Sequence, residues 1–253
     1  MKKILSIKNV VVSILGLLVI WQLVYSIGNF GDALFPSPSG AWKALVKIAK
    51  NGILLKSIGT SMYRFAVGYI SGVVAAVLLG LLLGRCAGVF KYINPVIQLL
   101  RPISPTAWMP FIVLWFGIGD IPAIVIIIIA AFFPVLLSTV AAVGGIDPIY
   151  LKVSGNFGIK QPQLMWKIIF PAAFPQIANG IRLALGTSWI FLVAGEMIGC
   201  QSGLGYLIID SRNNIDSATL LATIFVIGII GLLLDTVLSV SEKRILKSWG
   251  GGE

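Results

Sequence analysis

Residues 156–180 read NFGIKQPQLMWKIIFPAAFPQIANG, and they interrupt a chain whose neighbouring segments are apolar enough to lie in lipid. The parts before and after Gly158 are both compatible with helices, and Pro162 suits a first helical turn. Leu164 and Ile168 can share one side of the second helix. The stretch therefore predicts a short helical hairpin that continues rigidly into the next apolar segment. The alternative, an ordinary loop, accounts for neither the length of the insert nor its apolar residues.

The composition places the chain in the membrane class. Of its 253 residues 58% are hydrophobic and only 11% are charged, against roughly 25% charged residues in a soluble domain. The net charge of +10 could suggest nucleic-acid binding. Lysine and arginine retained on the cytoplasmic side of a membrane explain it better, so we expect no nucleic-acid partner.

The sequence lacks the residues on which most catalytic and metal sites depend. It contains no histidine, and Cys86 and Cys200 lie outside any C-x-x-C spacing. It has neither a G-x-x-x-x-G-K-[ST] nor a G-x-S-x-G motif. No apolar segment carries the clustered acidic residues of a proton relay. We therefore expect no catalysis, no metal and no cofactor in this chain.

Six apolar segments are long enough to cross a bilayer, whose core of about 30 Å needs about 20 helical residues. The first follows a basic start like that of a signal peptide, but its apolar run is too long, so we interpret it as an uncleaved helix. The fold class predicted is an all-α membrane protein with six transmembrane helices. These cover residues 10–27, 62–84, 92–116, 121–143, 178–199 and 218–240.

Lysine and arginine between these segments indicate the orientation. With the N-terminus inside, eleven fall in cytoplasmic segments and five in outer segments. Because cytoplasmic loops carry the excess of positive charge, we expect both termini in the cytoplasm. The hairpin then lies inside the cell, where it would pass force from a partner to the membrane helices.

The outer segment before residue 53 predicts an amphipathic helix on the membrane surface, with Ser39 as its N-cap. Trp42 and Leu45 belong to its apolar face. Its lysines recur at i, i+4 and i+7: Lys43, Lys47 and Lys50.

The third expected span contains NPVIQLLRPISPTAWMP, residues 94–110, whose four prolines require a bent or broken helix. Broken membrane helices border a pathway in some proteins and are only structural in others, and both interpretations stay open here. If this one borders a pathway, its candidate residues are Arg101, Ser104, Thr106 and Trp108.

Charges within the spans should have partners, because an isolated charge at the bilayer centre costs at least about 2.5 kcal/mol. Depth along the spans pairs Arg64 with Glu196 and Arg182 with Asp235, as two structural ion pairs. Arg101 has no acidic partner at its depth. It is the leading candidate for meeting an anion, although carbonyls freed by the neighbouring prolines could occupy it instead.

A family resemblance follows from the hairpin. Gly158 and the ending IIFPAAFP, residues 168–175, resemble the EAA loop of permease subunits of type I ABC importers. That pattern is E-A-A, three residues, Gly, about nine residues and I-x-L-P. This chain departs from it: Phe170 replaces the leucine, and the E-A-A positions read Lys152, Val153 and Ser154.

The resemblance extends over nearly the whole chain, and several stretches in the right order are similar to the nitrate/sulfonate/taurine subgroup of these permeases. It implies the type I ABC importer permease fold and a location in the bacterial inner membrane as a multi-pass protein. The similar stretches are LFPSPSGAW (34–42), LRPISPTAWMPFIVLWFGIG (100–119), NGIRLALGTSWIFLVAGEM (179–197) and GLGYLI (203–208).

The same resemblance implies the partners. They are two ABC ATPase subunits that carry ATP and Mg, an extracytoplasmic substrate-binding protein, and a second permease copy in a homodimer. In this family a coupling helix in the glycine-bearing loop docks in a groove of the ATPase. The coupling residues expected here are Ser154, Gly158, Ile159, Lys160, Gln161, Pro162 and Trp166.

The expected domain organisation follows the family. Residues 1–56 form the first transmembrane helix and the outer amphipathic helix, and residues 57–241 form the type-1 transmembrane domain with its cytoplasmic coupling loop at 144–177. Residues 242–253 are a cytoplasmic tail.

The function predicted is the permease subunit of an ATP-driven importer for a small solute, an anion of the nitrate, sulfonate or taurine kind. Members of the subgroup also serve aromatic or heterocyclic solutes. The main alternative is a self-sufficient channel or secondary transporter, and a membrane scaffold that anchors a cytoplasmic complex is a third.

Overall fold

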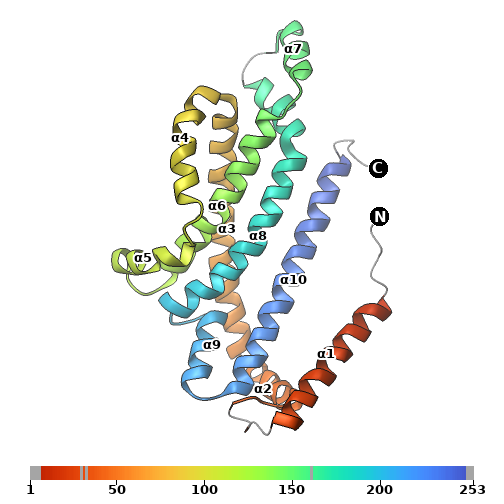
Figure 1. Ribbon diagram of the computed structural model, residues 1–253, viewed down its shortest axis with the longest axis vertical. Helices are drawn as coiled ribbons and strands as arrows, with labels where there is room; N and C mark the ends of the chain where they lie inside the picture. The colour runs from red at the N-terminus through yellow and green to blue at the C-terminus, as the bar shows by residue number, and fades with distance from the viewer. Residues whose placement is uncertain (1–6, 29–30, 32–33, 160–161, 249–253) are drawn as a thin grey trace.

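The computed structural model describes residues 7–28, 31, 34–159 and 162–248, and within these residues the chain is helical, without strands. In order the elements are α1 (Ile7–Gly28), α2 (Pro38–Lys50), α3 (Ile53–Arg85), α4 (Ala87–Leu100), η1 (Pro105–Trp108), α5 (Met109–Phe116), α6 (Asp120–Gly144), α7 (Pro148–Asn156), η2 (Met165–Ile169), α8 (Phe170–Gly199), α9 (Leu204–Asn213) and α10 (Ser217–Ser248). Two short turns interrupt the series of α-helices: a 3-10 turn, η1, between α4 and α5, and a π-helical turn, η2, between α7 and α8 (Figure 1).

Four of the six expected spans are continuous helices long and apolar enough to cross a membrane: α3, α6, α8 with its preceding turn, and α10. The first expected span lies in α1, where Leu15–Gly28 is a shorter apolar helix. The third is broken, as its prolines predicted. Its helix α4 ends at Leu100, and the chain resumes as η1 and α5 after Pro102.

The centre of the fold is the packing of α6 between α3 and α8. Glycines on α3 let α6 approach closely, since a Cβ built on Gly80 would lie 2.6 Å from Thr139 Cβ and one on Gly84 2.6 Å from Val143 Cβ. Small residues recur at every fourth position along this side of α3, which leaves it flat enough for that close approach. The side chain of Thr139 is fully buried in the contact.

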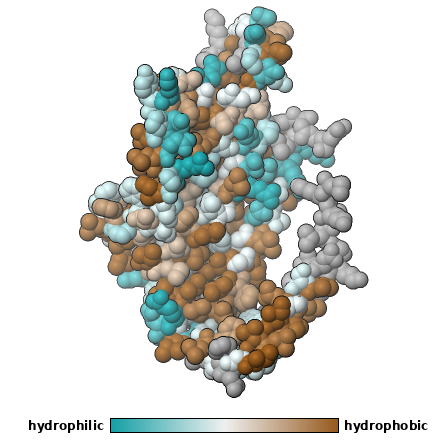
Figure 2. Space-filling view, viewed as in Figure 1, coloured by the Kyte–Doolittle hydropathy of each residue, from teal (hydrophilic) through white to brown (hydrophobic). Residues whose placement is uncertain are grey.

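The two ends of the bundle differ in what they carry. At one end stand α7 and the turn between α3 and α4, and at the other lie α2 and α9 (Figure 1). Hydrophilic side chains gather at the α7 end, whereas hydrophobic side chains cover much of the middle and α1 (Figure 2). The apolar middle is the part that would meet lipid.

The predicted amphipathic helix is present as α2, but its N-cap is Ser37 rather than Ser39. The Gly40 N–H donates to Ser37 Oγ over 3.1 Å. The expectation of Ser39 was wrong because Pro38 occupies the first helical turn, which moves the cap one residue ahead of that proline.

Candidate functional site

Helix α7 begins with a local signal. Asp147 is its N-cap, with Oδ1 accepting from the Ile149 N–H over 2.8 Å, and Pro148 occupies the first turn. The helix projects beyond the ends of α6 and α8 (Figure 1). Nine residues thus form a separate rod at the end of the bundle.

Gly158 ends this rod. Its φ is +66°, in the left-handed region that glycine adopts at low cost. The Gly158 N–H donates to Gly155 O over 3.0 Å and the Ile159 N–H donates to Ser154 O over 3.0 Å. These two bonds are a Schellman motif, which fixes the direction in which the chain leaves α7.

Helix α7 carries an exposed apolar face that sequence reasoning missed. Ile149, Val153 and Phe157 recur at i, i+4 and i+8, and their exposed fractions are 62%, 47% and 78%. Tyr150 beside them is 56% exposed. The spacing was readable once Asp147 and Pro148 were recognised as a helix start.

The expected coupling residues take different places. Ser154 is 2% exposed and its hydroxyl donates to Tyr150 O, so this side chain lies within the hairpin rather than on its open face. Pro162 O accepts from the N–H groups of Met165 and Trp166. Trp166 is 55% exposed. Ile159 follows the Schellman turn, and Lys160 and Gln161 lie outside the described residues.

The hairpin continues into α8 without a loop. The turn η2 is π-helical and runs directly into Phe170. Pro171 has no N–H to donate, and widened turns of this kind let a helix accommodate such an interruption. The ring centroids of Trp166 and Phe170 lie 5.7 Å apart, so the two side chains pack together. Motion of the hairpin can therefore reach the length of α8, which extends to Gly199.

Arg101 borders a half-open cavity of about 370 Å³ beside α6 and α8. Thr187 is the other hydrogen-bonding side chain of its lining, and Phe133 and Phe191 supply aromatic wall. Among the described residues Arg101 has no ion pair. The cavity can accept an anion with an apolar body. Its further lining residues are Ile103, Pro105, Ile129, Ala130, Pro134, Leu137 and Leu183.

The other three expected path residues do not line this cavity. Ser104 Oγ and Thr106 Oγ1 lie 2.8 Å apart and bond to each other. Trp108 packs against the cluster of Met109 and Ile112. Of the four candidates, the structure brings only Arg101 to the cavity.

Arg64 and Glu196 lie together in the core, 2.8 Å apart and 1% and 0% exposed. Asp120, which sequence reasoning missed, lies 2.6 Å from the guanidinium. The Glu196 carboxylate also accepts from the Ser61 hydroxyl at 2.8 Å and the Gly205 N–H at 2.9 Å. The network joins α3, α6, α8 and α9, and its buried charges are all partnered.

The second predicted pair is also in contact. Arg182 Nε lies 3.0 Å from Asp235 Oδ1 and Nη2 lies 2.9 Å from Oδ2, a bidentate geometry that ties α8 to α10. Both side chains are more than a third exposed. Among the residues that the structure describes, no group of three or more His, Cys, Asp or Glu side chains lies close enough together to hold a metal ion.

Comparison with known sequences assigns this arrangement to a family. Residues 72–247 match the family described as "Binding-protein-dependent transport system inner membrane component". The chain belongs to this permease family. The matched range contains the α7 hairpin, the Arg101 cavity and both partners of the α8–α10 ion pair.

Individual members agree with the assignment. The taurine transport system permease protein TauC of Escherichia coli (strain K12) is 31% identical over 240 residues, 93% of this chain and 87% of TauC. The nitrate import permease protein NrtB of Leptolyngbya laminosa is 30% identical over 235 residues, 91% of this chain and 84% of NrtB.

The permease fold is also seen in a solved structure. A chain of the MetNI methionine ABC transporter, in inward-facing conformations, matches with a TM-score of 0.64 over 78% of this chain and 96% of that chain. The two are 18% identical, so this likeness concerns the fold alone.

Proposed function

We propose that this member of the importer permease family spans the bacterial inner membrane six times, with both termini in the cytoplasm. The two spans beyond the four long apolar helices are α1 and the broken α4–α5 segment. The division into residues 1–56, 57–241 and 242–253, with the coupling loop at 144–177, belongs to the same proposal. The excess of positive charge on the α7 side supports this orientation.

The exposed apolar face of α7 carries the proposal. A protruding helix with Ile149, Val153 and Phe157 on one side is suited to lie in a groove of a partner. The partner is an ABC ATPase subunit that binds ATP and Mg, and this chain itself has no catalytic role. Gly158, Ile159 and Pro162 fix the direction in which the chain leaves α7, and Ser154 stabilises the inner side of the hairpin. Lys160, Gln161 and Trp166 belong to the same contact with the ATPase subunit.

The solute is an anion that passes the Arg101 cavity. The relatives named above serve taurine and nitrate transport, and both solutes carry a negatively charged oxygen group. A cationic guanidinium without an ion pair supports the same charge class. Ser104, Thr106 and Trp108 belong to the path next to the break rather than to the cavity wall.

The complete importer contains two ATPase subunits, an extracytoplasmic substrate-binding protein and a second copy of this chain. The Arg101 cavity is open on one side, so a second copy of the chain must face it to enclose a path. A twofold axis between the two copies provides that arrangement. The two hairpins then meet two ATPase subunits.

The experiment is affinity purification of the tagged chain in detergent, with mass spectrometry of what accompanies it. A P-loop ATPase in equal amount is the expected result. A chain that purifies alone and still moves solute in liposomes without ATP would contradict the proposal, and the channel or secondary-transporter alternative would then stand.

A further inference from the structure

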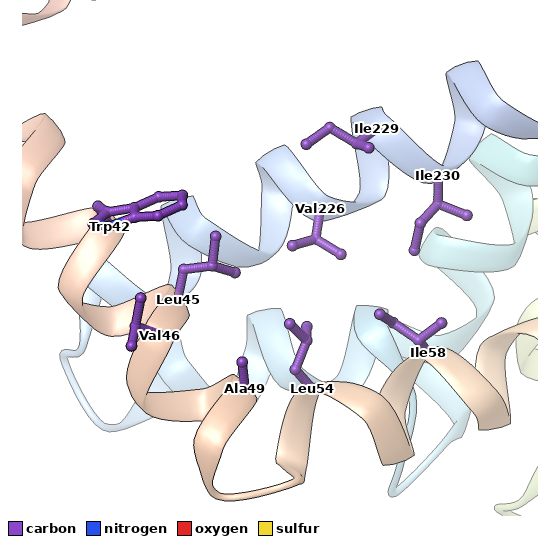
Figure 3. Close-up of a pocket in the computed structure, with 9 residues that line it drawn as sticks. All are labelled: Trp42, Leu45, Val46, Ala49, Leu54, Ile58, Val226, Ile229 and Ile230. Atoms are coloured by element: carbon purple, nitrogen blue, oxygen red, sulfur yellow. The ribbon is translucent and has the colours of Figure 1, made fainter.

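An apolar groove lies between α2, the start of α3, and α10, at the end of the bundle opposite α7. Figure 3 shows Trp42, Leu45 and Val46 on α2 facing Val226 and Ile229 on α10. The groove has a volume of about 410 Å³, and all nine of its lining side chains are apolar. Trp42 is 65% exposed, so the groove lies open along the surface of the bundle.

A second apolar groove runs beside the first. It lies between α1, α2 and α10, with a volume of about 330 Å³, and Leu18 and Trp21 line its α1 side. Trp42, Leu45 and Ile229 line both grooves. Two neighbouring apolar grooves that share three of their lining side chains match a ligand with two hydrocarbon chains.

The lysine row of α2, formed by Lys43, Lys47 and Lys50, lies next to these grooves. At about 100° per residue the buried face, the groove face and the lysine face of α2 are about 120° apart. All three lysines are exposed, and none forms an ion pair with the described residues. The sequence has no acidic residue between Asp32 and Asp120, so no near neighbour in the chain offsets their charge.

We propose that the two grooves hold the acyl chains of one anionic phospholipid, whose phosphate binds the lysine row of α2. An amphipathic helix with lysines on its polar face and tryptophan at its edge has the chemistry of a lipid surface site. The charge of the lysine row favours an anionic headgroup over a zwitterionic one. This site lies apart from the solute path and from α7, and it is independent of the proposed function.

The test measures tryptophan fluorescence of the full chain in uncharged detergent, with dibrominated phosphatidylglycerol or phosphatidylcholine added as quencher. Half-maximal quenching is expected at a mole fraction about fivefold lower for phosphatidylglycerol, from the attraction of a single lysine near a charged surface. Equal quenching by the two lipids would overturn the proposal. So would the absence of quenching at Trp42, which is the result expected if a second copy of the chain covers the grooves.

Two pairs of variants locate the site. Replacing both groove tryptophans, Trp21 and Trp42, by phenylalanine should remove most of the preference for phosphatidylglycerol, whereas Trp115→Phe, at a side chain 71% exposed on α5, should keep it. Replacing the lysine row by glutamine should abolish the preference. Replacing the exposed Arg85, Lys91 and Lys243 by glutamine removes the same charge elsewhere and should leave the preference intact. A preference lost in both charge variants, or in neither, would overturn the proposal.

Discussion

Arg64 is held by more partners than any other described charged side chain of the bundle, with Asp120, Glu196 and the backbone and hydroxyl of Ser202 all in contact. Glu196 is fully buried, so its carboxylate is stable there only because the Arg64 guanidinium, the Ser61 hydroxyl and the Gly205 N–H surround it. Removing one member of such a network leaves a charge without its partner in the core.

Glu196→Ala should therefore lower the free energy of unfolding by about 3–5 kcal/mol, near the lower value because Arg64 keeps Asp120. Asp235→Ala is the matched control, because its pair with Arg182 is more than a third exposed and should contribute at most about 1 kcal/mol. Thermal unfolding in detergent, followed by helicity, measures both. Equal losses in the two variants would contradict this account of the core.

At this scale the sequence predicted which charges meet but not everything they meet. Depth along the spans paired Arg64 with Glu196, because both lie in long helices of regular rise. Asp120 was not predicted, since it stands at the start of α6 where helix depth gives no register. The Gly205 N–H was not predicted either, because backbone donors have no side-chain signature.

Among the helices, α7 ends correctly only because Gly158 adopts a left-handed backbone conformation. Proline at 158 cannot take a φ of +66° and has no N–H for Gly155 O. In Gly158→Pro the chain should insert and purify normally, ATP hydrolysis by the complex should persist, and solute uptake in proteoliposomes should be lost. Gly155→Ala, in the same helix and with open space around its Cβ, is the control that should keep uptake. Unchanged uptake in Gly158→Pro would remove the hairpin from the mechanism.

Two glycine-to-alanine substitutions in α3 test its contact with α6, and their effects on stability should have opposite signs. Gly80→Ala should destabilise the fold by about 1–3 kcal/mol, because its Cβ would meet Thr139 at 2.6 Å. Gly59→Ala lies in the same helix with nothing within 4 Å of its Cβ, and it should stabilise α3 by up to about 1 kcal/mol. Unfolding temperatures of the two variants should move in opposite directions. A shift of the same sign and size would show that the glycines of α3 act only through helix propensity.

Helix boundaries also separate what sequence patterns can and cannot predict. Apolar length alone placed α3, α6, α8 and α10, because a bilayer imposes its thickness on a helix. The break after Leu100 followed from the prolines. The apolar face of α7 was missed because a rod of nine residues is too short for a periodic pattern to stand out against an apolar chain.

For the whole molecule, the two cysteines report the orientation. Cys86 is exposed at the turn between α3 and α4, on the α7 side, whereas Cys200 is buried after α8. Burial raises the pKa of the Cys200 thiol to about 11, so at neutral pH it is protonated and slow to react. A membrane-impermeant maleimide at pH 7 should label one cysteine per chain in inverted vesicles and none in right-side-out vesicles. Labelling from the outer side would reverse the topology.

The central claim is that α7 is the contact with the ATPase, and photo-crosslinking in native membranes tests it most directly. A photoreactive phenylalanine derivative replaces Phe157, which is 78% exposed at the C-cap of α7, or Trp42, which is 65% exposed at the opposite end of the bundle. We predict a covalent adduct with the ATP-binding subunit from position 157 and none from position 42. No adduct from 157, or equal adducts from both positions, would contradict the account.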